Sequence, residues 1–409
     1  MMCLALLLGS QLITRAQGAA NTTTDTAAAP ATPKTLQEQI EELQSQIDVL
    51  KDAINEPEGS IQTTVGDVRT LKKIKISGYI QARYQDNYTK TASSGASAET
   101  STFDVKRARI KVTGTPTDNT TAVIQFDLGD ATANGKYNLT TKDAYVGYTF
   151  GDGNASLHPT VTLGQLQTPF GYQLVQSSSV RETPEKSLVV RKLLDPVEYD
   201  RGIKFNNGVD SRLFYEVGLF NGTGANTTDN NQTKNVSGRV RYKVTDAFDA
   251  GGSFYFGNTN AAAITKDLTK DPASTGIAAD NFMKQLYGID AQYLWNDNSL
   301  KAEYVTGREL FVRATNDSHT PNTTADKSGY YLQFAHNFTK ADTGVLMYDV
   351  YQDKSPSVQA SSGRLTEYNI GLIHALDPST RVKLFYTIVK EEKTSNKNNL
   401  ITLELISLY

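Results

Sequence analysis

The sequence predicts an all-β protein, a 16-stranded antiparallel transmembrane β-barrel preceded by a short N-terminal α-helical coiled coil. Three observations predict this fold class. Apolar and polar residues alternate from Ile74 to the last residue, Tyr409. The connections between the alternating segments are long and short in turn. The composition, with 21 Tyr, 15 Phe and 30 Gly but only 38% hydrophobic residues, is typical of strands and turns.

Residues 1–18 have the pattern of an export signal. Leu4 to Leu8 form a short apolar region, and the small residues of Ala16-Gln17-Gly18 precede Ala19 as a cleavage site. No Lys or Arg precedes the apolar region, and a buried N-terminal helix is the alternative interpretation. The single cysteine, Cys3, lies in this segment, so the exported chain would contain neither a thiol nor a disulfide.

A coiled coil is predicted over residues 35–56, between a flexible Ala-, Thr- and Pro-rich linker at 19–34 and a second linker at 57–73. Its apolar positions are 4, 3, 4, 3 and 4 residues apart, and Pro57 ends the run. The alternative is a single amphipathic helix that covers a globular core. We expect self-association through Leu36, Ile40, Leu43, Ile47, Leu50 and Ile54. Ile at the heptad a positions and Leu at the d positions favours a coiled coil of two helices, whereas a barrel of this kind can form a trimer through contacts of the barrel itself.

Residues 74–409 form the predicted barrel. After the N-terminus no stretch of 18 or more apolar residues occurs, which excludes a helical membrane span. In a typical segment Val382, Leu384 and Tyr386 oppose Arg381 and Lys383, so that one face is apolar and the other is charged. Sixteen such segments begin near residues 74, 103, 121, 142, 160, 201, 212, 235, 250, 286, 299, 329, 344, 367, 380 and 400.

The lengths of the connections distinguish a membrane barrel from a soluble sandwich. Gln85–Thr102, Asp130–Thr141 and Thr168–Asp200 are long, whereas Thr115–Thr120 and Gly151–Pro159 are short. Long extracellular loops and short periplasmic turns produce this alternation. The even strand count places both barrel ends, and with them the coiled coil, in the periplasm. The terminal strand, with Leu403, Leu405 and Tyr409, resembles the signal that the barrel-assembly machinery recognises, so that machinery is an expected partner.

Seven short phrases occur in an order that resembles the phosphate-selective porin O and P family of bacterial outer-membrane porins. They are Phe103–Ile110, Gln125–Gly129, Asp143–Val146, Gly164-Gln165 with Thr168–Gly171, Asp200–Ile203, Gly218–Gly222 and Gly238-Arg239. The resemblance covers Lys75 to Tyr242 closely and the remainder in strand pattern only. It implies a trimeric porin for passive diffusion of small hydrophilic solutes and ions, with the third long loop folded inward to narrow the pore. It does not imply phosphate specificity.

The parity of each strand predicts which charged residues face the lumen. The basic candidates are Lys75, Arg83, Arg107, Arg109, Lys111, Lys204, Arg239, Arg241, Arg381 and Lys383, with Arg212, Lys243 and Lys301 as further members. The acidic candidates are Asp127, Asp143, Glu216, Asp290, Glu303, Asp349 and Glu404. This basic excess predicts a mild anion preference that includes phosphate-like anions. The alternative is that acids and bases pair across neighbouring strands and only rigidify the wall.

The third long loop is predicted to form the constriction. Its segment Arg181–Leu194 could form a short helix inside the pore, and the alternative is a surface loop. The expected constriction residues are Glu182, Glu185, Lys186, Arg191, Lys192 and Arg201. Basic groups near strand ends have a second interpretation as contacts for lipopolysaccharide phosphates, because outer-membrane lipid and lipopolysaccharide are expected partners.

No catalytic residue, metal or cofactor is expected. The four histidines, His158, His319, His336 and His374, lack metal-site spacing, and no phosphate-binding glycine loop or nucleophile elbow occurs. Nucleic acid is not an expected partner. Two rival functions are a structural envelope protein that tethers the outer membrane through its coiled coil, and a secreted all-β binding protein.

Overall fold

The computed structural model describes residues 35–55, 73–90, 97–131, 137–151, 158–194, 197–208, 212–229, 232–259, 279–313, 323–354, 363–393 and 397–409. The chain divides into two units, Met1–Thr70 and Leu71–Tyr409. The predicted signal peptide, the first linker and all of the second linker except Lys73 lie outside the described residues.

The N-terminal unit contains one described helix, α2 (Leu36–Asn55), which confirms the predicted helix. Thr35 and Glu38 form a capping box, in which the Glu38 N–H donates to Thr35 Oγ1 at 3.3 Å and the Thr35 N–H donates to Glu38 Oε2 at 2.8 Å. Ile40, Leu43 and Ile47 are 45%, 57% and 48% exposed, so within the described residues this apolar stripe is not buried. Of the predicted association residues, the side chains of Leu36, Leu50 and Ile54 lie outside the described set, and self-association stays a prediction.

Among the residues that the structure describes, no helix is both long and apolar enough to cross a bilayer.

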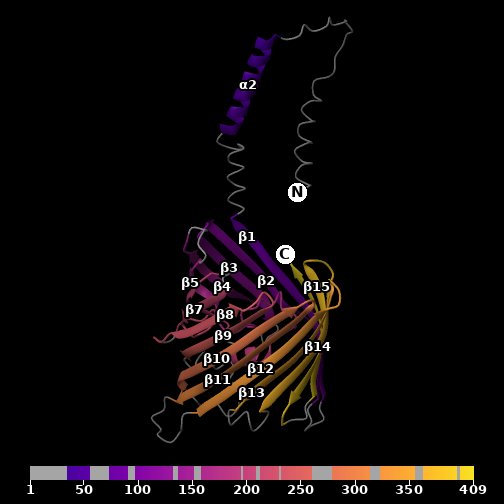
Figure 1. Ribbon diagram of the computed structural model, residues 1–409. Helices are drawn as coiled ribbons and strands as arrows, with labels where there is room; N and C mark the ends of the chain where they lie inside the picture. Colours follow the sequence, from indigo (N-terminus) through magenta and orange to yellow (C-terminus); the bar gives the residue numbers. More distant parts are fainter. Residues whose placement is uncertain are drawn as a thin grey trace. The chain divides into compact units, whose positions relative to one another are not determined.

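The second unit is a closed barrel of sixteen antiparallel strands, which confirms the predicted fold class (Figure 1). Each strand pairs with its neighbours in the sequence, and β1 pairs with β16 to close the barrel. The strands are β1 (Ile74–Lys90), β2 (Ser97–Thr117), β3 (Thr120–Ala131), β4 (Tyr137–Thr149), β5 (Thr160–Gln167), β6 (Tyr199–Asn206), β7 (Leu213–Phe220), β8 (Asn235–Lys243), β9 (Phe248–Thr259), β10 (Ala279–Trp295), β11 (Asn298–Arg313), β12 (Thr323–Asn337), β13 (Asp342–Asp353), β14 (Arg364–Ala375), β15 (Thr380–Glu391) and β16 (Lys397–Leu408).

Four strands begin five to seven residues earlier than predicted, namely β2, β4, β10 and β12. The interpretation of Gln85–Thr102 and Asp130–Thr141 as long loops was therefore wrong. Gln85 pairs with Thr102 in a ladder that continues to Lys90 and Ser97, and β4 already begins at Tyr137. In β2 and β12 the backbone hydrogen bonds continue into residues that are mainly polar on both faces, where apolar alternation no longer reveals a strand.

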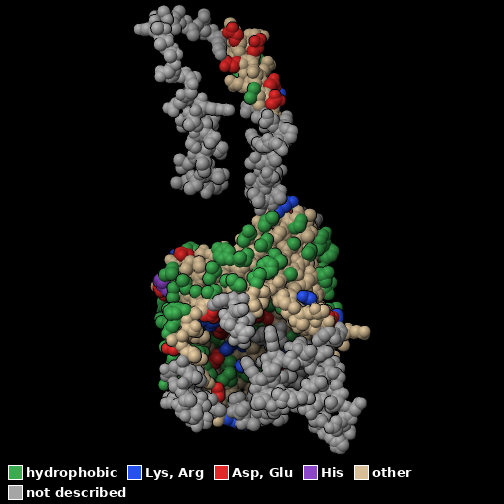
Figure 2. Space-filling model, turned by 180° about the vertical axis from the view of Figure 1, so that it is seen from behind, with side chains coloured by type: hydrophobic (Ala, Val, Ile, Leu, Met, Phe, Trp, Pro, Cys, Tyr) green, Lys and Arg blue, Asp and Glu red, His purple; other side chains and the backbone are tan. Residues whose placement is uncertain are grey.

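The alternation along each strand separates an outer from an inner face. In β16, Ile401, Leu403 and Leu405 are exposed on the outside, whereas Thr402 and Glu404 are buried on the inside. Figure 2 shows hydrophobic side chains gathered over the outer wall, and charged side chains in the hollow beyond them. This arrangement matches an apolar belt around a polar lumen.

Aromatic rings form two rows on the outer face. One row lies near the end with the short turns, where Tyr293 stacks on Trp295 at 5.1 Å and Trp295 contacts Phe334 at 6.1 Å between ring centroids. The other row lies farther from these turns, where Tyr348 contacts Tyr330 at 6.0 Å and Tyr368 at 5.2 Å. Aromatic rows on either side of an apolar band are typical of a bilayer-spanning barrel, because amphipathic rings prefer the two interfaces.

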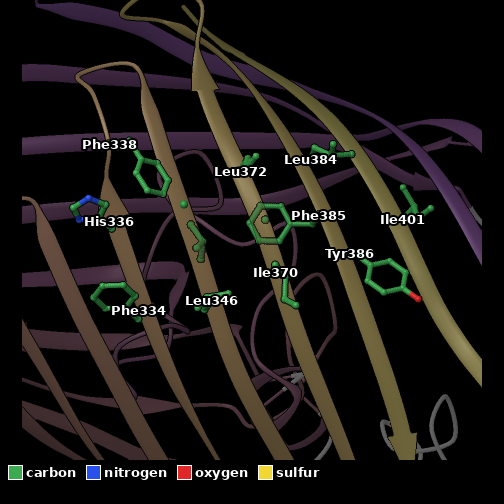
Figure 3. A pocket seen from close by; sticks show the side chains of 13 residues that line it. Phe334, His336, Phe338, Leu346, Ile370, Leu372, Leu384, Phe385, Tyr386 and Ile401 are labelled. Carbon is green, nitrogen blue, oxygen red and sulfur yellow. The ribbon is translucent and has the colours of Figure 1, made fainter.

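An apolar groove of about 670 Å³ lies over β12–β16 (Figure 3). Its walls include Leu346, Ile370, Leu372, Leu384 and Tyr386, which are all exposed on the outer face. The groove therefore opens on the outer side of the barrel and is not a candidate solute path.

The C-terminal tyrosine closes the barrel against a glycine on β1. The backbones of Tyr409 and Gly78 exchange hydrogen bonds of 3.0 and 3.1 Å, and the Tyr409 hydroxyl donates to the Arg109 carbonyl on β2 at 2.9 Å. A Cβ atom at Gly78 would lie 2.1 Å from that carbonyl oxygen and 2.6 Å from the Tyr409 hydroxyl. Only glycine therefore allows the terminal ring to span β1.

We expect Gly78→Val to reduce the yield of folded barrel strongly, because its side chain would separate β1 from Tyr409. Tyr409→Phe should cost about 0.5–1.5 kcal/mol, the usual net contribution of one hydrogen bond. Gly114→Ala on β2 is the matched control, since a Cβ there meets no atom closer than 3.9 Å. The measurement is the heat-modifiable folded fraction on detergent gels. Equal yields for Gly78→Val and Gly114→Ala would contradict this account of closure.

Candidate pore constriction

The connection between β5 and β6, which the structure describes at residues 168–194 and 197–198, lies inside the barrel. A hydrophobic cluster joins Phe170, Leu188 and Leu193 of this loop to Leu286 of β10 and Val305 of β11, and each of these side chains is fully buried. Further members of the cluster are Leu174, Val189, Val190, Leu194, Val197, Tyr255 and Tyr351. Each aliphatic side chain withdrawn from water contributes about 1.5–3 kcal/mol, so the loop is held firmly against the inner wall of β9–β13.

Carboxylates of this wall accept backbone hydrogen bonds from the loop. Glu303 accepts from the Tyr172 and Gln173 N–H groups at 3.1 Å each, and Asp349 accepts from the Leu188 N–H at 2.5 Å. Gly171 has φ +59°, and a Cβ there would lie 2.0 Å from Glu303 Oε1. A glycine is therefore required at this position in the phrase Thr168–Gly171.

Ion pairs attach the loop to several parts of the wall. Arg191, in the π-helical turn η1 (Val190–Leu194), contacts Glu367 of β14 at 2.5 Å, and Glu182 pairs with Lys301 of β11. Within the loop, Lys186 pairs with Glu198. Burial lowers the pKa of Lys186 to about 8 against the opposing effect of Glu198. Lys186 is therefore mostly charged at pH 7 and loses its charge as the pH rises through about 8.

Glu185 lies against the opposite wall, on β1 and β2. Its carboxylate is 2.8 Å from Arg83 Nη1, 3.5 Å from Arg107 Nη2 and 3.9 Å from Lys106 Nζ. Burial alone would raise the pKa of Glu185, but Arg107, Lys106 and Arg83 hold it well below its usual range. The loop thus spans the lumen between an acidic wall and a basic wall.

Arg181 forms the polar centre of the loop and is fully buried. Its guanidinium donates to the Pro184 carbonyl at 2.9 Å and to the Thr183 carbonyl at 3.3 Å, and its own carbonyl accepts from Lys383 Nζ at 2.9 Å. Burial lowers the pKa of Arg181 to about 10, so it remains charged at neutral pH. Arg181 was predicted only as the first residue of a short helix, and its role as the polar centre of the loop was not predicted.

The ten basic residues that were predicted to face the lumen fall into two groups, one buried and one in contact with water. Arg83, Arg109, Arg239 and Lys383 are buried, and Arg109 pairs with Asp127 at 2.7 Å and Lys383 with Glu404 at 3.1 Å. The other six retain water contact: Lys75 is exposed, and Arg107, Lys111, Lys204, Arg241 and Arg381 are half-buried. Lys204 lies 3.1 Å from Glu216 on β7, which also faces Arg239 at 3.9 Å.

The seven acidic lumen candidates do not divide in this way, because all of them are buried. The side chains that are at most 9% exposed are those of Asp127, Asp143, Glu216, Asp290, Glu303, Asp349 and Glu404. Glu303 and Asp349 lie beneath the loop that they bind. Water in the lumen therefore contacts more of the basic candidates than of the acidic ones.

Three predicted residues have other positions. Arg201 is part of β6, and its exposed side chain lies on the opposite face of the strand from inward-facing Lys204. Its assignment to the constriction loop was therefore wrong. Arg212 precedes β7 and lies over the ring of outward-facing Tyr242 at 5.5 Å, which removes it from the lumen set. Lys192 is in the loop, but its side chain is exposed and does not belong to the buried ion pairs.

Sequence reasoning also missed Lys106, because a bulge disturbs the parity of β2. Gln81 pairs with Arg107 and Ala82 with Val105, which leaves Lys106 as an extra residue that reaches Glu185. The apolar inner wall was missed as well. Its signal was present in runs such as Phe254–Phe256 and Tyr330–Leu332, where both parities are apolar.

Comparison with known proteins decides the family. The model of the phosphate-selective porin O and P family matches residues 74–405, which is the whole barrel except its last four residues. The chain belongs to this family. It is therefore a channel for passive diffusion in the bacterial outer membrane.

Solved structures share the fold of this porin at low sequence identity. The anion-selective porin of Comamonas acidovorans has a TM-score of 0.57 at 11% identity, over 82% of this chain and 99% of that chain. The outer-membrane channel DcaP of Acinetobacter baumannii has 0.56 at 10% identity, over 82% and 97%. OmpT of Vibrio cholerae, in its trimer form, has 0.54 at 11% identity, over 82% and 99%. No curated protein sequence matches the chain significantly.

Proposed function

We propose that this porin prefers anions, and that solutes pass along the inner faces of β2, β6 and β8. The observation that carries the proposal is the unequal exposure of the lumen charges. Six of the ten basic candidates contact water, whereas all seven acidic candidates are buried. A low-dielectric wall focuses the field of the accessible charges, so the potential in the lumen is positive and attracts anions.

The reversal potential in a KCl gradient across a planar bilayer tests the proposal. We expect the unmodified porin to favour chloride over potassium, by about two- to tenfold. Replacing Lys111, Lys204 and Arg241 together by Gln should reduce that preference. Arg212→Gln is the control, because Arg212 lies over the ring of outward-facing Tyr242 and not in the lumen. Cation selectivity of the unmodified porin would refute the proposal.

We further propose that the porin is a homo-oligomer, most simply a trimer, and that α2 forms a periplasmic coiled coil between its copies. The exposed stripe of Ile40, Leu43 and Ile47 supports association, and the even strand count supports periplasmic placement of both barrel ends. Lipid and lipopolysaccharide would contact the outer wall, and the strand ending at Tyr409 would engage the barrel-assembly machinery.

The oligomer proposal predicts that Ile47→Lys lowers the temperature at which the oligomer dissociates in detergent, because a buried a-position lysine weakens a coiled coil. Gln46→Lys, at a position between the apolar ones, is the control. Conductance per barrel should not change in either variant. Identical dissociation temperatures for Ile47→Lys and the unmodified porin would exclude a role for α2 in assembly.

A further inference from the structure

The apolar groove on the outer face of β12–β16 has walls that follow the register of the sheet. One wall is a row of directly paired residues, one from each strand: Phe334, Leu346, Ile370, Tyr386 and Ile401. The other wall is the row that lies two residues away along the strands: His336, Gly344, Leu372 and Leu384. Figure 3 shows the two rows on either side of the groove. The groove is therefore one continuous trough that crosses the strands.

Two glycines shape the groove. At Gly344 the ring of Phe338 takes the place of a side chain, since a Cβ there would lie 2.8 Å from that ring. At Gly371, on the floor, the ring of Phe385 lies against the backbone, and a Cβ there would lie 2.4 Å from it. Both rings line the groove, so aromatic side chains form one end and part of the floor.

The groove begins beside a short turn and rises into the apolar belt. Its β12 end adjoins the turn 338–341, where Phe338 is 63% exposed, and its β16 end is at Ile401, in the middle of the last strand. The strands of a barrel tilt by about 35–45°, so a row across them is also inclined to the bilayer normal. The strands lie about 4.8 Å apart, so the groove from β12 to β16 is roughly 19 Å long. One leaflet of the hydrocarbon core is about 15 Å thick, so the groove has the length of an inclined acyl chain.

Ionisable residues of both signs lie in and beside the short turns at the β12 end. The described ones are Asp297, Lys340, Asp342, His374 and Asp377. Lys340 is exposed, and Asp342 Oδ1 lies 2.7 Å from His374 Nδ1. A headgroup with a phosphate and an ammonium group can pair with both signs, whereas a headgroup that is only anionic would be repelled by the three acids.

We propose that the groove holds one acyl chain of a zwitterionic phospholipid of the periplasmic leaflet, with its headgroup at the turn 338–341. This inference goes beyond ion selectivity and rests on the proposed periplasmic position of the short turns. Within a bilayer, packing and not the escape from water decides which surface an acyl chain prefers. A chain in the groove has protein atoms on three sides, whereas a chain on the convex wall has them on one. The concave shape also fits a chain better than it fits the convex wall of a second barrel.

Native mass spectrometry of the full-length porin in detergent tests the proposal, with palmitoyl-oleoyl phosphatidylethanolamine as the added probe. We expect one lipid to remain bound to each barrel. Gly344→Val should lower the bound fraction about fivefold, because its side chain displaces the Phe338 ring into the groove. Leu372→Ala, which removes part of one wall and adds no bulk, should lower it as well. Gly252→Val is the matched control, since Gly252 lies on β9, away from the groove, and a Cβ there meets no atom closer than 3.8 Å.

Equal bound fractions in the unmodified porin and in folded Gly344→Val and Leu372→Ala would overturn the inference. Equal retention of a phosphatidylglycerol with the same chains would overturn the zwitterionic headgroup, and retention of lipopolysaccharide instead would place the groove in the other leaflet. If no lipid were retained and Gly344→Val lowered the temperature at which the oligomer dissociates, a second copy would cover the groove. Failure of the proposed anion preference is distinguishable, because it would appear in the reversal potential and leave the bound lipid unchanged.

Discussion

Replacing residues 171–194 by two glycines should raise the single-channel conductance roughly two- to threefold, because the loop between β5 and β6 fills part of the lumen. The same deletion should lower the anion preference. It would uncover Glu303, Asp349 and Glu367, which are now buried at the inner wall. In planar bilayers the single-channel conductance measures the width of the passage, and the reversal potential of the same preparation measures the anion preference.

Replacing Thr339 and Lys340, two exposed residues of the turn between β12 and β13, by two glycines serves as the control for a change in another connection of the barrel. Its conductance and selectivity should equal those of the unmodified porin. An unchanged conductance after removal of residues 171–194 would mean that the loop does not narrow the passage. A rise in anion preference would contradict the buried position of the three acids.

Lys383→Met should destabilise the barrel by about 3–5 kcal/mol, because it leaves the Glu404 carboxylate buried without its counter-charge. Lys383 Nζ and Glu404 Oε1 are 3.1 Å apart, and neither side chain is exposed. We expect a lower urea midpoint for unfolding in detergent, with the folded fraction measured by the heat-modifiable gel shift. Lys284→Met is a less severe comparison, since Lys284 shares Glu309 with Lys327, which would still neutralise it.

The double variant Lys383→Met with Glu404→Gln decides the mechanism. Removing both charges abolishes the desolvation cost, and a glutamine can still accept from Gln81, so most of the lost stability should return. If the double variant were less stable than Lys383→Met alone, the loss would come from packing and not from an uncompensated charge.

Much of the fold could be predicted from local patterns because a barrel strand carries its own signal. The alternation of Val382, Leu384 and Tyr386 with charged residues requires no knowledge of partners. Strand starts near the short turns were accurate for this reason. The starts of β2 and β12 were not, because their ladder hydrogen bonds extend into the mainly polar residues 97–102 and 323–328.

The site was less accessible to prediction because its contacts are long-range. Glu185 reaches Arg83 across 102 positions of sequence, and parity alone could not pair them. Lys106 was hidden by a bulge, which shifts the parity by one residue. Arg201 was placed in the loop because its phrase closes the loop in sequence, whereas the backbone has already entered β6.

The apolar inner wall shows a signal that the prediction did not use. Consecutive apolar residues such as Tyr330, Tyr331 and Leu332 cannot all face lipid in a strand. In a porin such runs indicate an inner surface that another segment covers, here the loop between β5 and β6. The alternative of a surface loop could have been discounted on that ground.

Modification of single cysteines by a negatively charged methanethiosulfonate reagent reports which lumen positions water reaches, because the sequence contains a single cysteine, Cys3. Lys111 and Arg241 contact water, whereas Val305 is buried beneath the loop. Lys111→Cys and Arg241→Cys should therefore react during recording, with a fall in conductance and in anion preference. Val305→Cys should show no change. Reaction at Val305→Cys together with no reaction at the two basic positions would contradict the account.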